Sequence, residues 1–317
     1  MNAPQLDHSY ADAFPELVHA AHAEEQPDPQ LVVLNDDLAR ELGLDPDWLR
    51  SPDGIQFLLG RGGNRTVAMG YAGHQFGQLS PQLGDGRALL LGELKGRDLH
   101  AKGTGPTVFS RGGDGRGALG PMLREYLVSE AMHALGVPTT RALAVISTGR
   151  KIMRTGVVPG AVLVRTAASH LRIGTVQYTR IRGDIDLTER LCTYARQRHY
   201  PTLSSHAELF SAVMDAQIST VAQWMRLGFI HGVMNTDNTT LSGETIDYGP
   251  CAFLNRFDPA TFFSSIDTHG RYAFSNQPVI LGWNLARLAE AMVPLIDVDA
   301  AQETMNSFPE RWEKAQA

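Results

Sequence analysis

The segment His231–Pro250, HGVMNTDNTTLSGETIDYGP, says more about the fold than any other part of the sequence. It is expected to form a loop and short strands. Asp237, Asn238 and Asp247 place oxygen donors on this segment, and divalent cations such as Mg²⁺ or Mn²⁺ prefer oxygen ligands. Taken alone, the tetrapeptide Asn-Thr-Asp-Asn is better explained as a turn with side-chain caps, but the residues around it reverse that preference.

The spacing of this segment resembles the catalytic loop of protein kinases, H-R-D-x-x-x-x-N, which is followed by Asp-Phe-Gly. His231 begins the motif, Asn238 lies five residues after Val233, and an Asp-Tyr-Gly tripeptide begins at Asp247. Val233 occupies the position of the catalytic Asp. The segment therefore has the metal-ligand residues of a phosphotransferase but lacks a base at the usual position.

A second group of candidate residues surrounds Lys102. Residues 88–94 are expected to form a buried strand, and a short strand after a turn at 95–98 ends at Lys102. The following loop, 103–117, contains six glycines in fifteen residues, so its backbone N–H groups could surround a phosphate. A Lys beside it could reach the same phosphate. The alternative is an exposed edge-strand Lys beside a flexible surface loop.

Two arginines and a helix follow. Arg165 and Arg172 are seven residues apart, and a turn between them would let both guanidinium groups bind one anion. The alternative is a pair of solvated surface arginines. Residues 119–136 are expected to form a helix closed by a glycine and a proline. In kinases a helix Glu holds the strand Lys in position.

This helix offers two candidates for that role, Glu125 and Glu130. Its apolar stripe at i, i+4 spacing predicts the buried face, and consists of Leu123, Leu127, Ala131 and Ala134. Glu130 lies near the stripe and Glu125 well away from it. A buried Glu needs a partner, so periodicity alone favours Glu130.

Composition narrows the class of protein. The 317 residues suffice for a large domain or for two lobes with sizeable cores. The formal net charge of -6 argues against a nucleic-acid partner bound through bulk positive charge. The two cysteines form no disulfide framework, which indicates a reducing, cytoplasmic location. The sequence shows no signal-peptide pattern and no apolar run of the ~18 residues that a membrane span needs.

The order of the expected elements indicates the fold class. Strands and a glycine loop come first, then one helix, further strands, and helices over residues 185–230 that precede the polar loop. This order predicts an α+β fold with two lobes, not the βαβ alternation of a doubly wound sheet. We expect an N-terminal lobe over residues 1–167, with the glycine-rich nucleotide loop and a helix. A mainly helical C-terminal lobe over 168–317 would carry the metal and catalytic loop.

Longer motifs resemble those of one known family. They are GHQFGQLSPQLGDGR (73–87), KGTGPTVFSRGGDGR (102–116), REYLVSEAMHALGVPTTRAL (124–143) and HGVMNTDNTTLSGETIDYGPC (231–251). These segments are similar to those of the selenoprotein O family of protein adenylyltransferases, and the resemblance covers essentially the whole chain. It implies a protein-kinase-like fold in which ATP lies flipped. AMP would then pass from ATP to a Ser, Thr or Tyr hydroxyl of a protein, with release of pyrophosphate.

The resemblance also implies roles for individual residues. The implied ATP-binding set is Gly84, Gly86, Arg87, Lys102, Asp114, Gly115, Arg165, Arg172 and Asp247. Within this set, Arg165 and Arg172 match the arginines that hold the terminal phosphates. Glu125, against the periodicity argument for Glu130, matches the residue that positions Lys102.

For the polar loop, the resemblance implies a displaced base. Asp237 matches the proposed catalytic base, so the base stands four residues after Val233. Asn238 and Asp247 match the ligands of Mg²⁺ or Mn²⁺. A flipped nucleotide presents a different phosphorus atom, and this explains why the base and the acceptor hydroxyl stand elsewhere.

The chain departs from that family at its end. Family members continue past the last helix seen here, and their extreme C-terminus often carries a redox-active Cys or selenocysteine. This sequence stops at Ala317, so the family's C-terminal region and its redox control are not expected. Two alternatives stay open: a conventional kinase-like phosphotransferase, and a non-catalytic nucleotide-binding pseudokinase. The sequence identifies neither the protein substrates nor the oligomeric state.

Overall fold

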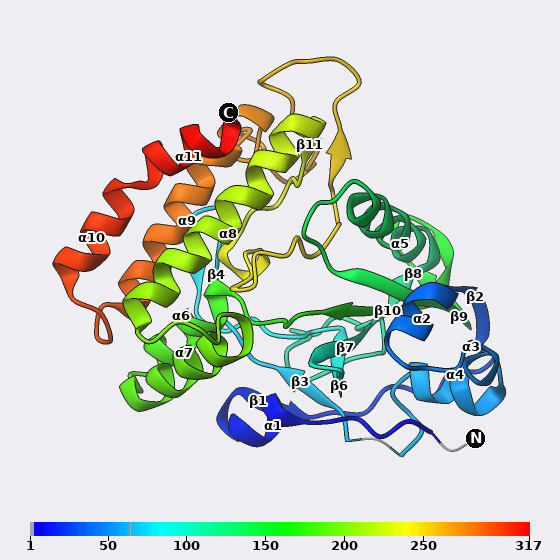
Figure 1. Ribbon diagram of the computed structural model, residues 1–317. Coiled ribbons are helices and arrows are strands. Elements are labelled where there is room, and N and C mark those ends of the chain that lie inside the picture. The colour runs from blue at the N-terminus through cyan, green and yellow to red at the C-terminus, as the bar shows by residue number, and fades with distance from the viewer. Residues whose placement is uncertain (1–2, 64) are drawn as a thin grey trace. The chain divides into compact units, whose positions relative to one another are not determined.

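The computed structural model describes residues 3–63 and 65–317 and divides the chain into two compact units (Figure 1). Unit 1 comprises Met1–Gly70, Leu83–Leu135 and Thr140–Ser169, and unit 2 comprises Tyr71–Gln82, Gly136–Thr139 and His170–Ala317. The expected lobes were continuous with a boundary at residue 167, whereas residues 71–82 and 136–139 belong to unit 2 and the last crossing follows Ser169. A large antiparallel sheet in unit 1 and mainly helices in unit 2 confirm the α+β class.

Unit 1 is built on one antiparallel sheet with the strand order β1-β3-β6-β7-β10-β9-β2, in which β8 also pairs with β10. The strands are β1 Val18–Ala20, β2 Gln30–Leu34, β3 Val67–Met69, β6 Ala88–Leu94, β7 Arg97–Lys102, β8 Gly117–Ala118, β9 Arg141–Met153 and β10 Val157–Ala167. The expected hairpin is present, with Ala88 of β6 opposite Lys102 of β7. Because β7 lies between β6 and β10, Lys102 is not on an edge strand, and that alternative is wrong.

Helices cover both faces of this sheet. They are α1 Ser9–Ala13, η1 Pro15–Leu17, α2 Asp36–Glu41, α3 Pro46–Leu49, α4 Pro52–Leu58 and α5 Leu119–Ala134. Successive residues of a strand point to opposite faces. Accordingly, Val162 and Val164 of β10 join the apolar core beneath α2–α4, whereas Ala161 and Leu163 pack with Met122 of α5. A strand that is buried on both faces therefore has apolar residues at consecutive positions of its sequence.

Helix α5 occupies the expected residues but buries a different face from the one predicted. Its buried residues are Met122, Glu125, Ser129 and Met132. Leu127, which belonged to the predicted stripe, is 66% exposed, and Ala131 and Ala134 are also exposed. The apolar residues of this helix lie on several faces, and two polar residues lie on the buried one. Periodicity therefore predicted the wrong buried face for α5. It also predicted the wrong glutamate, Glu130, as the partner of Lys102.

Unit 2 is mainly helical. Its helices are α6 Ile173–Ile181, α7 Ile185–His199, α8 His206–Leu227, α9 Gln277–Met292, α10 Val298–Asn306 and α11 Phe308–Gln316, with short 3₁₀ turns η2 Thr236–Asn238 and η3 Phe274–Asn276. Two hairpin-like pairs join them, β4 Gly73–Gln75 with β5 Gln78–Ser80 and β11 Phe229–Ile230 with β12 Ala252–Phe253. Helices α9 and α11 both pack on α8 (Figure 1).

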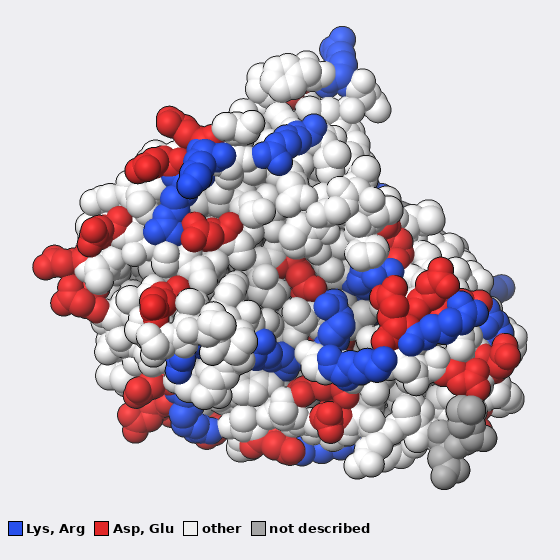
Figure 2. All heavy atoms as spheres, in the orientation of Figure 1, with Lys and Arg blue, Asp and Glu red and all other residues white. Residues whose placement is uncertain are grey.

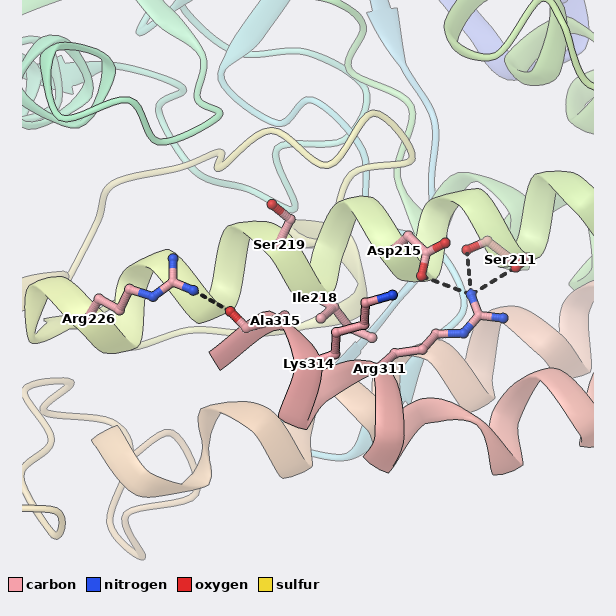
Figure 3. Close-up of a pocket in the computed structure, with 8 residues that line it drawn as sticks. All are labelled: Ser211, Asp215, Ile218, Ser219, Arg226, Arg311, Lys314 and Ala315. Atoms are coloured by element: carbon pink, nitrogen blue, oxygen red, sulfur yellow. Dashed lines mark hydrogen bonds and ion pairs between the residues drawn. The ribbon is translucent and has the colours of Figure 1, made fainter. Parts of the chain in front are cut away.

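Local signals define the ends of α8. Ser205 and Glu208 form a capping box at its start, and Gly228 ends it with a left-handed φ of 65°. Near its middle, Asp215 of α8 pairs with Arg311 of α11 at 2.8 Å beside a cavity of about 520 Å³ (Figure 3). The polar segment 231–250, which the structure describes in full, follows α8 and β11 as a loop that contains η2, and the short strands expected within this segment do not form.

Helix α9 supports that loop from the other side. Asn284 donates one hydrogen bond to the carbonyl oxygen of Met234 at 2.8 Å and another to Thr239 Oγ1 at 3.1 Å. The loop is therefore held by a buried side chain of a packed helix. Within the described residues, no helix combines the length and the apolarity that a bilayer crossing needs.

The buried face of α5 can be tested by paired substitutions. Met132 is fully buried, so Met132→Ala should lower the free energy of unfolding by about 2–5 kcal/mol. Leu127→Ala, on the exposed face, should change it by less than about 0.5 kcal/mol. Denaturant unfolding followed by circular dichroism measures both. Equal losses in the two variants would show that the assigned face is wrong.

Candidate active site

A buried carboxylate in unit 1 binds two cations. Glu125 of α5 accepts a hydrogen bond from Lys102 Nζ at 2.8 Å and one from Arg165 Nη1 at 2.6 Å, one on each oxygen. The three side chains are only 5–6% exposed. Ions this deeply buried must be paired. The structure thus brings together Lys102, Glu125 and Arg165, and it contradicts the solvated alternative for Arg165.

Two further buried residues, Asp85 and His100, extend this cluster and were not among the predicted site residues. Arg165 Nε donates to His100 Nδ1 at 3.4 Å, and His100 Nε2 lies 3.2 Å from Asp85 Oδ2. Since Nδ1 accepts, the ring proton is assigned to Nε2, which donates to Asp85. A signal was present: His100 precedes Lys102 by two residues on one strand, so both side chains lie on the same face.

Glu130 has a different role. It binds Arg141 Nε and Nη2 at 2.9 Å and accepts a bond from Asn35 Nδ2, also at 2.9 Å. These bonds tie α5 to the start of β9 and to the residue that caps α2. Lys102 takes its carboxylate partner from Glu125 instead, as the family resemblance implied.

The predicted nucleotide turn lies at the end of the same sheet. Gly84 has a φ of 115°, and a Cβ there would overlap the ring of Phe109, so only glycine fits. The carbonyl oxygen of Gly86 accepts a bond from Ser110, and that of Arg87 accepts one from Gly103 N at 2.6 Å. The turn is therefore closed onto the glycine-rich loop, while Arg87 is exposed.

Asp114 and Gly115 hold that loop closed. Asp114 pairs with Arg154 at 2.9 Å, and this hydrogen-bonded partner lowers the pKa of the Asp114 carboxyl. Gly105 N donates to the carbonyl oxygen of Gly115 at 3.0 Å. The pair of Asp114 and Arg154 is exposed, so the loop is tethered at its far end by an ion pair at the surface. Figure 2 shows that Lys and Arg side chains lie beside Asp and Glu side chains on one face of the molecule.

In unit 2, the structure buries Asp237 with one carboxylate oxygen unpaired. Its Oδ2 accepts a bond from Gln75 Nε2 at 3.2 Å, whereas its Oδ1 has no partner among the described residues. Burial raises the pKa of Asp237 to about 6, and Asp247 adds to the rise, although Arg172 and Gln75 oppose it. A Cβ on Gly73 would overlap Oδ1, so backbone glycine leaves the room that this oxygen occupies.

Arg172 supports the backbone beside that carboxylate. Its Nη1 donates to the carbonyl oxygen of Asp237 at 3.2 Å and its Nε to that of His170, also at 3.2 Å. Its guanidinium lies 4.1 Å from the centre of the Tyr71 ring. Arg172 is 4% exposed, so the solvated alternative is wrong for it too. It belongs to unit 2 and Arg165 to unit 1.

The proposed metal ligands lie on the same loop. Asn238 Nδ2 donates to the carbonyl oxygen of Val233 at 3.0 Å, and the described residues give its amide oxygen no hydrogen bond. Asp247 is half-buried with a φ of 66°, a conformation that residues other than glycine seldom adopt. His231 Nε2 donates to the carbonyl oxygen of Ile246 at 2.8 Å and so holds the backbone before it.

These donors fit a divalent cation in part. An amide oxygen and a carboxylate are hard ligands that suit a metal whose other ligands are phosphates and water. Within the described part of the chain, no group of three or more His, Cys, Asp and Glu side chains could hold a metal. Asn238 and Asp247 would therefore need the oxygens of a bound anion to complete the coordination.

The chain has close relatives among known proteins. A sequence model of the family described as Protein adenylyltransferase SelO matches residues 4–316. Protein nucleotidyltransferase YdiU of Corynebacterium efficiens is 62% identical, over 98% of this chain and 68% of its own. Proteins of the same name from Corynebacterium glutamicum (strain R) and Mycobacterium sp. (strain KMS) are 54% and 56% identical, over 98% of this chain and 70% and 68% of theirs.

The unpaired oxygen of Asp237 predicts a stability effect. The carboxyl pKa is about 6 in the folded chain against an ordinary 3.8, so ionisation at neutral pH costs about 3 kcal/mol. Because the pKa of Asp237 is raised in the folded chain, its protonated carboxyl stabilises the fold fully below pH 3.8, and this stabilisation is lost as the pH rises through about 6. Asp237→Asn should therefore be more stable than the wild type at pH ~7.5 but similar near pH ~4.

Denaturant unfolding across this pH range measures the effect. Asp37→Asn serves as the control, because the Asp37 side chain is 89% exposed and should show little change at either pH. A variant at position 237 that is destabilised at neutral pH would contradict the assigned burial cost.

Proposed function

The chain belongs to the SelO family of protein adenylyltransferases, and on that basis we propose how its residues transfer AMP to a protein. The reaction is nucleotidyl transfer: AMP leaves ATP for a protein acceptor. We propose Ser, Thr or Tyr as the acceptor residues, since their hydroxyl oxygens can attack phosphorus. Pyrophosphate is then the second product.

We further propose that the fold is kinase-like. Two features support this: a strand Lys paired with a helix Glu, and a loop that carries an Asn and a later Asp. The first is the pair of Lys102 and Glu125, and the second is the pair of Asn238 and Asp247. Protein kinases use the same two arrangements to hold phosphate and metal.

The buried cations of unit 1 are proposed to bind phosphate. Lys102 and Arg165 are held by one carboxylate, so their donors are oriented before ATP arrives. Preorganised charges stabilise the charge that grows on a leaving pyrophosphate. We propose nucleotide contacts for Gly84, Gly86, Arg87, Asp114 and Gly115 of unit 1, and for Arg172 and Asp247 of unit 2.

Asn238 and Asp247 are proposed to hold Mg²⁺ or Mn²⁺ together with phosphate oxygens. When bound, such a cation neutralises charge on the phosphates during transfer. The left-handed backbone conformation of Asp247 fixes the direction of its side chain. The hydrogen bond from the Asn238 amide to the carbonyl oxygen of Val233 fixes the second ligand on the same loop.

Asp237 is the proposed general base, and its unpaired Oδ1 is the observation that carries this assignment. The acceptor hydroxyl would lose its proton to Oδ1 while its oxygen forms a bond to the α-phosphorus. The bond from that phosphorus to the bridging oxygen breaks, and pyrophosphate leaves with the electron pair. A pKa of about 6 suits a base that works near neutral pH, because it is ionised yet still accepts a proton.

Labelled ATP tests the reaction. ATP labelled at the α-phosphorus should label protein, whereas ATP labelled at the γ-phosphorus should not. Asp237→Asn should slow the transfer by about 10²–10⁴-fold. Its effect on ATP affinity, measured by calorimetry, should be small because a base acts on the acceptor. In the wild type, kcat/KM should rise as the pH passes about 6 and Asp237 loses its proton.

The two alternatives give different results in this experiment. Incorporation of γ-label alone would identify a conventional kinase. Incorporation of neither label, with ATP bound at ordinary affinity, would identify a pseudokinase. An Asp237→Asn variant with full activity would leave AMP transfer in place but remove the assignment of the base.

Metal dependence tests Asn238 and Asp247 by binding alone. In the wild type, ATP affinity measured by calorimetry should fall about tenfold or more when a chelator removes Mg²⁺ and Mn²⁺. Asp247→Ala should show the weaker affinity with or without chelator. Asp258→Ala, at an exposed carboxylate nearby in sequence, should behave as the wild type does. Chelator sensitivity that survives in Asp247→Ala would place the metal elsewhere.

A further inference from the structure

Unit 2 contains an open groove, lined by both apolar and polar side chains, outside the residues assigned above. It has a volume of about 610 Å³, within the range of small-molecule sites. Its apolar wall consists of Phe76, Ile266, Val279 and Ile280. Ile266 and Val279 are 67% and 71% exposed, so two of the large aliphatic side chains that line the groove face solvent. Exposed apolar residues grouped in this way mark interaction sites.

The wall of this groove is hydrogen-bonded to the loop of the proposed base. Phe76 N donates to Asn235 Oδ1 at 3.3 Å and to the hydroxyl of Tyr272 at 3.1 Å. The Tyr272 hydroxyl donates in turn to Asn235 Oδ1 at 2.5 Å. The residue before Phe76 is Gln75, whose side chain binds Asp237 Oδ2 at 3.2 Å. One short hairpin therefore contacts the carboxylate with one residue and lines the groove with the next.

The turn of that hairpin places Phe76 in an unfavourable backbone conformation. Phe76 and Gly77 adopt φ values of 52° and 81°, the left-handed conformations of a tight two-residue turn. A bulky residue is disfavoured there, so surrounding contacts must hold Phe76 in place. The Phe76 ring contacts the Tyr272 ring edge-on at 5.2 Å between centroids. Glycine or asparagine would form the turn more readily, and the aromatic ring adds apolar surface to the groove instead.

The charge of the groove favours some ligands over others. Asp267 is 2% exposed, and its two oxygens accept bonds from the backbone nitrogens of Arg271 and Tyr272 at 2.9 and 2.8 Å. The Arg271 guanidinium is half-buried and lies 4.9 Å from the centre of the Trp283 ring. The Asp267 carboxylate is therefore bound by backbone donors, and the Arg271 guanidinium is the more exposed of these two ionised groups. Such a groove accepts an apolar side chain and offers Lys or Arg no exposed carboxylate partner among its described lining residues.

We propose that this groove binds the segment of the acceptor protein that flanks the modified hydroxyl and selects a large apolar side chain there. The inference rests on the proposed function, since it takes Asp237 as the base that receives the acceptor's proton. Its physical basis is continuity: a chain lying along Phe76 passes the hairpin that binds Asp237. The groove would thus determine which protein segments are modified.

Peptide binding and label transfer test the inference separately. The probes are fluorescent peptides with one central Ser, in which one flanking position at a time carries Leu or Lys. At one position the wild type should bind the Leu peptide about tenfold or more tightly than the Lys peptide, by fluorescence anisotropy. The same preference should appear in kcat/KM for transfer of α-label from ATP.

A charge reversal separates recognition from damage. Val279→Glu should reverse the preference, so that the Lys peptide binds at least as tightly as the Leu peptide. Val298→Glu is the matched control, because Val298 is 60% exposed on α10 and does not line the groove. It should keep the wild-type preference. A damaged fold would weaken both peptides alike and would not favour Lys.

The outcomes are distinct. A Leu preference that Val279→Glu reverses supports the groove even where no label is transferred, a result that would count against the proposed reaction alone. Equal binding of the Leu and Lys peptides at every position overturns the groove even if α-label is transferred. A Leu preference that Val279→Glu leaves unchanged also overturns it.

Discussion

Glu125 accepts hydrogen bonds from two buried cations, Lys102 and Arg165, and the arrangement of unit 1 depends on this. Removing Lys102 and Arg165 from water is costly, and one carboxylate with an oxygen for each offsets that cost. Helix α5 must therefore turn its Glu125 face to the sheet, even though that face is not its most apolar. The same constraint orients the cations before any phosphate binds, so that a requirement of folding also prepares the site.

The polar loop of unit 2 shows the opposite case. There, Asp237 is buried with an unpaired oxygen, and its raised pKa expresses that cost. The loop withstands it because its backbone is bound by Arg172, by Asn284 of α9 and by its own Asn238. The burial of Asp237 thus costs stability, and the hydrogen bonds to the surrounding backbone offset that cost. Such compensation is common at residues whose role is chemical.

Much of the fold could be predicted from local signals, and the errors have a physical cause. The hairpin that ends at Lys102 and the helix at 119–134 follow from turn residues and periodicity, which act over a few positions. The buried face of that helix does not. It depends on which strand residues lie beneath it, and those come from β9 and β10, later in the chain. Two buried groups, Asp85 and His100, were missed because neither belongs to an apolar pattern.

The spacing of residues 231–250 predicted the candidate metal ligands, and the family resemblance added the candidate base on the same loop. Partners that are distant in the chain were beyond such reasoning. The carboxylate of Glu125 meets Lys102 and Arg165 across 23 and 40 residues, and Gln75 reaches the candidate base across 162. Such pairs form only when strands and helices pack, since a side chain's partner, burial and pKa are properties of its surroundings and not of its neighbours in sequence.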